Sequence, residues 1–150
     1  MFAMFATKTE KGLKRYAGKR KYVSQMSQHE IKGLSNRLKR LSSSGNLTFT
    51  DHTLDRVMQK GIAVTQKDII SMIGNSDIVE YKIDVDNLRG GYSERLVVSS
   101  KALVNRSYRL KVVFDLTNRT VITVWMNHVK DTHKTLDWTL YDKNMKVLGI

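Results

Sequence analysis

The residues best suited to catalysis are a histidine and two cations on one face of an expected helix. His52, Arg56 and Lys60 follow one another at intervals of four, in a helix that Thr50 or Asp51 can cap. Cleavage of RNA without a metal requires a general base for the 2′-hydroxyl, a general acid for the leaving oxygen and cations for the phosphate. This face supplies those types of group. From the spacing alone, a surface or structural histidine at a helix start is the alternative.

Other catalytic chemistries have no support in the sequence. The chain of 150 residues has no cysteine, so it has neither a thiol nucleophile nor a thiolate metal site. The histidines do not form an HExxH pair, and a Walker loop and a serine-hydrolase elbow are both missing. We therefore expect no metal and no cofactor. Because no apolar run approaches the length of a membrane span, we also expect a cytoplasmic protein with no membrane partner.

The charge of the chain indicates a polyanionic partner. Lys and Arg number 26 and Asp and Glu 14, which gives a formal net charge of +12. Residues 1–45 hold 11 basic and 2 acidic residues and so carry +9 of this charge. Such an asymmetry is typical of a nucleic-acid-binding arm beside a more neutral domain. The alternative is a basic tail that aids solubility or meets an acidic protein or a membrane surface.

Hydrophobic periodicity predicts an α+β fold. A helix over residues 28–41 begins with the capping-box pair Ser27 and Glu30, and from residue 78 the apolar period changes from helical to two. We expect a basic N-terminal helical arm with an amphipathic helix (1–45), then a domain (46–150) in which two helices pack on a four-stranded antiparallel sheet. The expected strands cover residues 78–83, 94–100, 108–114 and 120–126, with 136–140 as a less clear edge strand.

Alternation along these strands divides the sheet into two faces. The apolar set, expected to face the helices, consists of Leu96, Val98, Leu110, Val112, Phe114, Ile122, Val124 and Met126. On the first strand the pattern is ambiguous, and the favoured choice puts Val79, Tyr81 and Ile83 inward and Glu80 and Lys82 outward. The other face then carries Arg95, Arg109, Lys111, Thr123 and Trp125. Cations can hold phosphates and a tryptophan can stack on a base, so this open face is a candidate nucleic-acid surface. An ordinary solvated sheet face is the alternative.

The order of helices and strands resembles the superfamily of barnase, EndoU-type nucleases, tRNA-cleaving colicins and RelE-type toxins. The segment 49–62, which includes the histidine and its two cations, looks like the entry to small bacterial and phage members. The stretches 95–98 and 121–125 resemble their central and last core strands. The resemblance covers residues 47–128.

The resemblance implies a metal-independent, toxin-type endoribonuclease that acts on tRNA or mRNA. His52 would be a general acid or base, Arg56 or Arg95 a phosphate holder, and Thr123 a substrate contact. The alternative is a noncatalytic phage or bacterial protein that binds nucleic acid or inhibits a host protein. RNA is the first expected partner and DNA the second, with a host protein or an antitoxin or immunity protein as a further one. The expected nucleic-acid-binding residues are Lys14, Arg15, Lys19, Arg20, Lys21, Arg37, Lys39, Arg40, Lys60, Arg109, Lys111 and Trp125.

Overall fold

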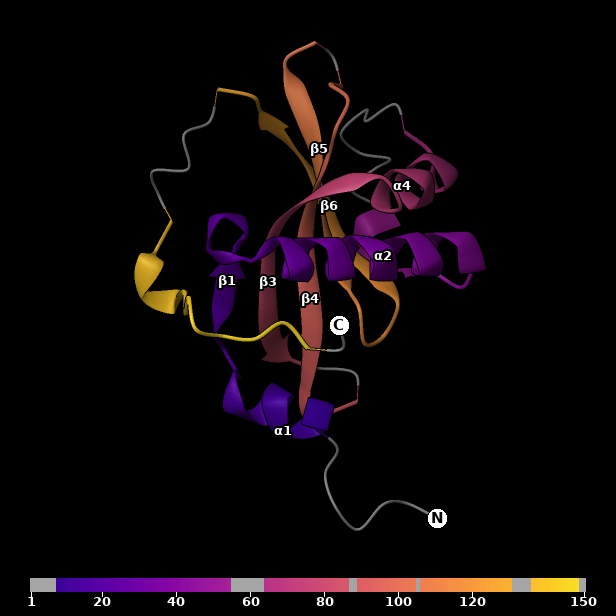
Figure 1. Cartoon of the computed structure of the whole chain (residues 1–150). Helices are drawn as coiled ribbons and strands as arrows, with labels where there is room; N and C mark the ends of the chain where they lie inside the picture. The colour runs from indigo at the N-terminus through magenta and orange to yellow at the C-terminus, as the bar shows by residue number, and fades with distance from the viewer. Residues whose placement is uncertain (1–7, 55–63, 87–88, 105, 131–135, 149–150) are drawn as a thin grey trace.

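A six-stranded mixed sheet forms the centre of the protein (Figure 1). The computed structural model describes residues 8–54, 64–86, 89–104, 106–130 and 136–148. The strands are β1 (Arg20–Tyr22), β2 (Thr48–Phe49), β3 (Ser76–Val85), β4 (Tyr92–Ser100), β5 (Tyr108–Asp115) and β6 (Thr120–His128). Their order across the sheet is β1-β3-β4-β5-β6-β2.

The predicted α+β class is confirmed, but the predicted four-stranded antiparallel sheet is wrong in detail. The four long strands β3 to β6 form the expected antiparallel meander. The short strand β1 adds to β3 at one edge, and β2 pairs in parallel with β6 at the other. Strands of two or three residues are too short to show a period of two, so the sequence pattern did not reveal them.

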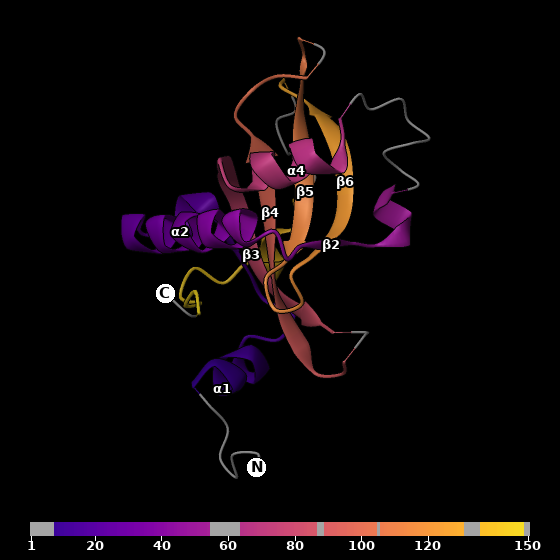
Figure 2. The same cartoon turned by 90° about the vertical axis from the view of Figure 1, so that its right-hand side faces the viewer.

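Helices α2 (Gln28–Ser44) and α4 (Gln66–Ile73) cover one face of the sheet, as Figure 2 shows from the side. Ser27 and Thr65 each cap their helix in a capping box, as the sequence predicted. Gly45 ends α2 with φ 71°, a left-handed conformation in which glycine avoids the strain of a side chain. No helix within the described ranges is both long and apolar enough to cross a membrane.

The described part of the basic N-terminal segment packs against the sheet and the C-terminal segment. Helix α1 (Lys8–Arg15) precedes β1, and the short 3-10 helix η1 (Val23–Gln25) leads into α2. In β1, the side chain of Lys21 is buried, and its Nζ lies 2.8 Å from Oε1 of Glu30 and donates to the carbonyl of Met145 at 2.7 Å. The C-terminal segment therefore holds the N-terminal segment in place, and Figure 1 shows it running below α2 across β3 and β4.

The core confirms most of the predicted inward-facing residues and corrects two. Each long strand contributes fully or almost fully buried side chains, among them Tyr81, Leu96, Val112, Phe114 and Val124. The expected inward residues Val79 and Ile122 are only partly buried, and Ile78 and Val121 take the inward positions. The register shifts between Ile78 and Glu80 and again between Val113 and Phe114, so that each bulge inserts one residue and reverses the alternation beyond it.

Two further predicted elements are the helix that begins after Thr50 and the edge strand at 136–140. Residues 51–54 form the helical start expected after Thr50, whereas the rest of that helix, with Arg56 and Lys60, lies outside the described residues. The less clear edge strand at 136–140 is instead the 3-10 helix η2 (Trp138–Leu140), capped by Asp137.

Candidate functional site

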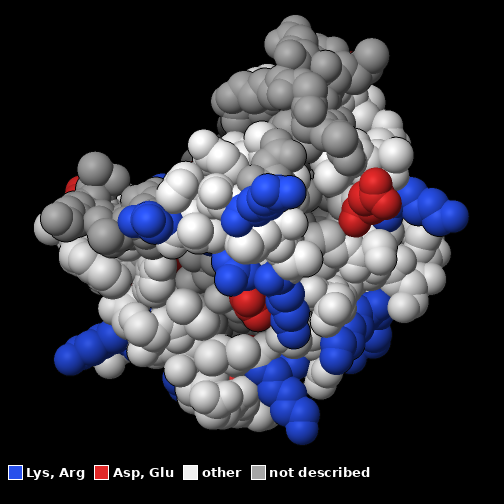
Figure 3. Space-filling view, turned by 90° about the horizontal axis from the view of Figure 1, so that it is seen from above, with Lys and Arg blue, Asp and Glu red and all other residues white. Residues whose placement is uncertain are grey.

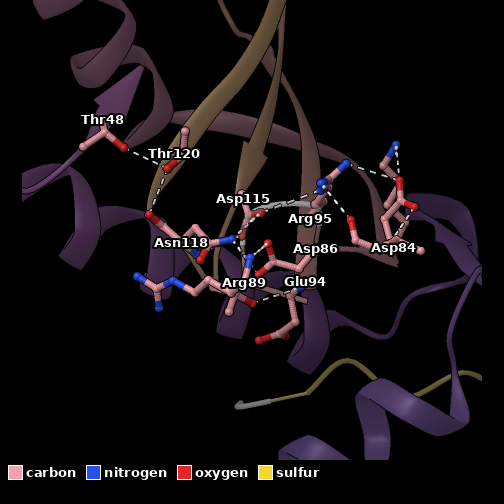
Figure 4. A network of polar contacts seen from close by, with 12 residues as sticks. Thr48, Asp84, Asp86, Arg89, Glu94, Arg95, Asp115, Asn118 and Thr120 are labelled. Carbon is pink, nitrogen blue, oxygen red and sulfur yellow. Dashed lines mark hydrogen bonds and ion pairs between the residues drawn. The ribbon is translucent and has the colours of Figure 1, made fainter. Parts of the chain in front are cut away.

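The open face of the sheet carries the expected cations, but carboxylates neutralise several of them. Arg95 Nη1 donates to Oδ2 of Asp84 at 3.3 Å, and its Nε lies 3.7 Å from Oδ2 of Asp115 (Figure 4). Lys82 is 4.0 Å from Asp84, and burial together with the charge of Arg20 lowers the pKa of this lysine. Arg95 is thus already held by two carboxylates and is poorly placed to receive a phosphate.

A polar network next to Arg95 closes the turn between β5 and β6. The Asn118 side-chain amide donates to Asp86 at 3.0 Å and to Asp115 at 3.1 Å, and both carboxylates are buried. The hydroxyls of Thr48 and Thr120 lie 2.8 Å apart and join β2 to β6 (Figure 4). This network fixes the ends of the strands. In the described ranges no three His, Cys, Asp or Glu side chains form a group that could hold a metal ion.

His52 is exposed on the helical turn of residues 51–54, which hydrogen bonds fix to β6. Thr53 Oγ1 donates to the carbonyl of Ile122 at 2.7 Å, and Thr50 Oγ1 donates to the same carbonyl at 3.1 Å. These hydrogen bonds attach the turn to Ile122, the residue before Thr123 on β6. Arg95 is on β4, two strands away and so roughly 10 Å from β6. The structure thus places His52 on a turn attached to the residue before Thr123, but it does not bring Arg95 to this turn.

The other expected binding residues differ in how accessible they are. Lys14, Arg15, Lys19 and Lys39 are exposed, whereas Lys21 and Lys111 are buried. Arg20 lies 3.8 Å from Glu80, and Arg109 donates to the carbonyls of Ser100 and Lys101 at 3.1 and 2.7 Å. Lys111 pairs with Trp125 across β5 and β6 on the open face. Arg37 is half-buried.

A groove with unpaired arginines lies between α2 and the β5–β6 turn. It encloses about 440 Å³ and is lined by Arg37, Arg40, Leu41, Ser44, Leu116, Thr117 and Arg119. Arg37 is held at the groove by Glu94 through two contacts of 3.1 Å and by the carbonyl of Leu148. Arg40 and Arg119 are exposed, and in the part of the chain that the structure describes neither has a carboxylate partner.

Sequence reasoning identified Arg37 and Arg40 but missed Arg119. Arg119 falls between the predicted strands 108–114 and 120–126. Arg119 has φ 54° and is the last residue of this turn, where it lies across the groove from α2. A basic residue at the tip of a hairpin is the signal that could have identified it.

Basic side chains also spread over the opposite end of the sheet, at the β4–β5 turn. Figure 3 looks onto this end and shows lysines and arginines with a few acidic side chains between them. Lys101 and Arg106 of the turn are both exposed. The positive charge is thus distributed over several surfaces. Among them, the groove has a defined volume and lining.

No family model, curated protein or solved structure matches the chain. The resemblance to the ribonuclease-toxin superfamily therefore stays a prediction, and the functional argument depends on the geometry of the site.

Proposed function

We propose that this protein binds RNA and that the groove between α2 and the β5–β6 turn receives the phosphate backbone. The observation that carries the proposal is the pair Arg40 and Arg119, two exposed guanidinium groups on either side of one groove that have no carboxylate partner among the described residues. A third guanidinium, that of Arg37, is fixed at the groove by Glu94.

Arginine suits this role because its planar guanidinium can donate two parallel hydrogen bonds to phosphate oxygens. The net charge of +12 supports the proposal, since it attracts a polyanion and accelerates encounter at low salt. RNA is the first partner to test because of the resemblance to RNA-cleaving proteins, and DNA of the same sequence is the comparator.

Removing both groove cations should weaken RNA binding and reduce its salt dependence. For Arg40→Gln with Arg119→Gln we expect roughly tenfold weaker binding, and a log-log salt slope smaller by up to about 1.4 if each arginine neutralises one phosphate. Fluorescence anisotropy of a labelled single-stranded RNA, measured over a series of salt concentrations, gives both quantities.

The matched control is Lys32→Gln with Lys143→Gln, which removes the same charge from exposed positions outside the groove lining. Its salt slope should change less than that of the groove variant. Equal slopes for the two variants would reject the groove as the phosphate site. Absence of RNA and DNA binding by the wild type would reject nucleic acid altogether and would favour an acidic protein partner.

A second candidate function is metal-independent RNA cleavage, favoured by the exposed His52 on the turn that Thr53 attaches to Ile122, the residue before Thr123 on β6. If the protein cleaves RNA, His52→Ala should reduce the rate by about 10²- to 10⁴-fold, because a positioned side chain then no longer transfers the proton. RNA affinity should change little. Gel analysis of RNA incubated in EDTA should show products with 2′,3′-cyclic phosphate or 3′-phosphate ends.

His29→Ala is the control for this experiment, since His29 is an exposed histidine in the first turn of α2. It should leave cleavage unchanged. Intact RNA after incubation with the wild type, or equal cleavage by His52→Ala, would exclude this second function and leave RNA binding as the activity.

A further inference from the structure

A small pocket lies on the face of the sheet opposite α2 and α4. It encloses about 170 Å³ and is lined by Tyr22, Val79, Glu80, Val97, Lys111, Trp125, Asn127 and Leu136. The pairings of Tyr22 with Glu80, of Glu80 with Val97 and of Lys111 with Trp125 place these side chains on a single face. The pocket and the arginine groove therefore lie on different faces of the sheet.

The size and lining of the pocket suit one planar ring system. A cavity of about 150 Å³ is large enough for a benzene ring. Val79, Val97 and Leu136 supply apolar walls, and the indole of Trp125 supplies an aromatic surface on which a base can stack. Polar groups at the rim of such a pocket then select among rings of similar size.

Glu80 gives the pocket a carboxylate oxygen that no donor of the described residues reaches at hydrogen-bond distance. The residue is 8% exposed, and its Oε2 atom is buried with no hydrogen-bond partner among the described residues. Two side chains of the fold approach this carboxylate: Arg20 Nη1 is 3.8 Å from Oε2, beyond hydrogen-bond distance, and Tyr141, whose pKa is raised by burial and by the charge of Glu80, has a buried hydroxyl that also lacks a partner at hydrogen-bond distance. Since buried polar atoms are normally satisfied, a ligand with an N–H donor would complete this site.

An exposed aromatic cluster continues from the pocket. The ring of Tyr22, which lines the pocket, lies 5.6 Å from the ring of Trp138, and Trp138 lies 5.0 Å from the ring of Tyr141. Trp138 is 54% exposed, so one of its surfaces is available for a second, neighbouring base. A duplex offers neither base to these rings, because its bases are stacked and paired.

From these observations we propose that the pocket binds one unpaired nucleobase with an exocyclic amine, taken from a single-stranded segment of RNA. The inference rests on the proposed RNA binding and adds base selectivity to it. Cytosine and uracil provide the critical comparison, since the amine of cytosine occupies the position of a carbonyl in uracil. The amine can donate to Glu80, whereas the carbonyl would face the carboxylate and could accept only from another donor of the lining, such as Lys111.

The test compares labelled oligocytidine and oligouridine of equal length by fluorescence anisotropy. The wild type should bind oligocytidine at least about tenfold more tightly, the effect of one hydrogen bond to a charged group. Glu80→Gln should bring the two affinities together, because a carboxamide can donate to a carbonyl as well as accept from an amine. Circular dichroism and thermal melting establish that this variant is folded.

A second measurement does not depend on changing Glu80. The chain has two tryptophans, so Trp138→Phe leaves Trp125 as the sole indole fluorophore. Oligocytidine should quench this fluorescence strongly and oligouridine weakly at equal concentration. Trp125→Leu should reduce the preference for cytosine.

The outcomes separate this inference from the RNA-binding proposal. Equal affinities of the wild type for the two oligonucleotides, or an unchanged preference in a folded Glu80→Gln variant, would overturn the base pocket and leave RNA binding in place. The variant Arg40→Gln with Arg119→Gln should bind both oligonucleotides more weakly by the same factor and keep the preference for cytosine. That result would support the groove and the pocket as two separate sites. If neither oligonucleotide nor any other RNA binds, both proposals fail.

Discussion

Val112→Asp is expected to leave the protein largely unfolded under conditions in which the wild type is folded. Val112 is fully buried in the middle of β5, between Val98 of β4 and Val124 of β6. An aspartate there would bury an unpaired charge in an apolar core, which costs several kcal/mol or more. A typical domain has only about 5–15 kcal/mol of stability. Far-ultraviolet circular dichroism and urea denaturation at neutral pH would measure the loss.

Val85→Asp is the matched control for this prediction. It makes the same chemical change at the end of β3, where the side chain is 51% exposed. The free energy of unfolding should then change by about 0.5 kcal/mol or less. If the two variants lose similar stability, Val112 is not in the core and the assignment of the faces is wrong.

The faces of the long strands could be predicted because burial on one side imposes a period of two. This rule succeeded for Leu96, Val98 and Val112, where β4 pairs with β5 without a register shift. It failed at Val79 and Ile122, where a bulge adds one residue to a strand. Whether a strand contains a bulge depends on its pairing with the neighbouring strand, and a single strand's pattern does not contain that information.

The candidate site could be predicted only in part, because the sequence shows charges but not their partners. Arg95 and Lys21 look like free cations in the sequence, yet their carboxylates come from positions 9 or more residues away. Arg40 is one of the expected nucleic-acid-binding residues, and it is exposed on α2. Arg119 joins it in the groove only because the sheet brings the β5–β6 turn beside α2.

Glu94→Ala is expected to destabilise the protein by about 3–5 kcal/mol, because it leaves a partly buried arginine without its partner. Glu94 is 4% exposed, accepts two hydrogen bonds of 3.1 Å from Arg37 and accepts another of 2.6 Å from the hydroxyl of Tyr81. Burial and the negative charge of Glu94 raise the pKa of Tyr81, so this hydroxyl remains a donor at neutral pH. Urea denaturation would measure the change in the free energy of unfolding.

A double-mutant cycle tests whether the cost comes from the unpaired charge. Arg37→Met combined with Glu94→Leu should be less destabilising than Glu94→Leu alone, because no buried charge then lacks a partner. If the effects of the two substitutions simply add, the ion pair is too well solvated to matter and the loss comes from packing and from the Tyr81 hydroxyl.

The same cycle also bears on the groove, since Glu94 holds the arginine that lines it. Glu94→Ala, wherever it remains folded, should bind RNA no more weakly than the wild type, because removing the carboxylate leaves the guanidinium free to contact phosphate.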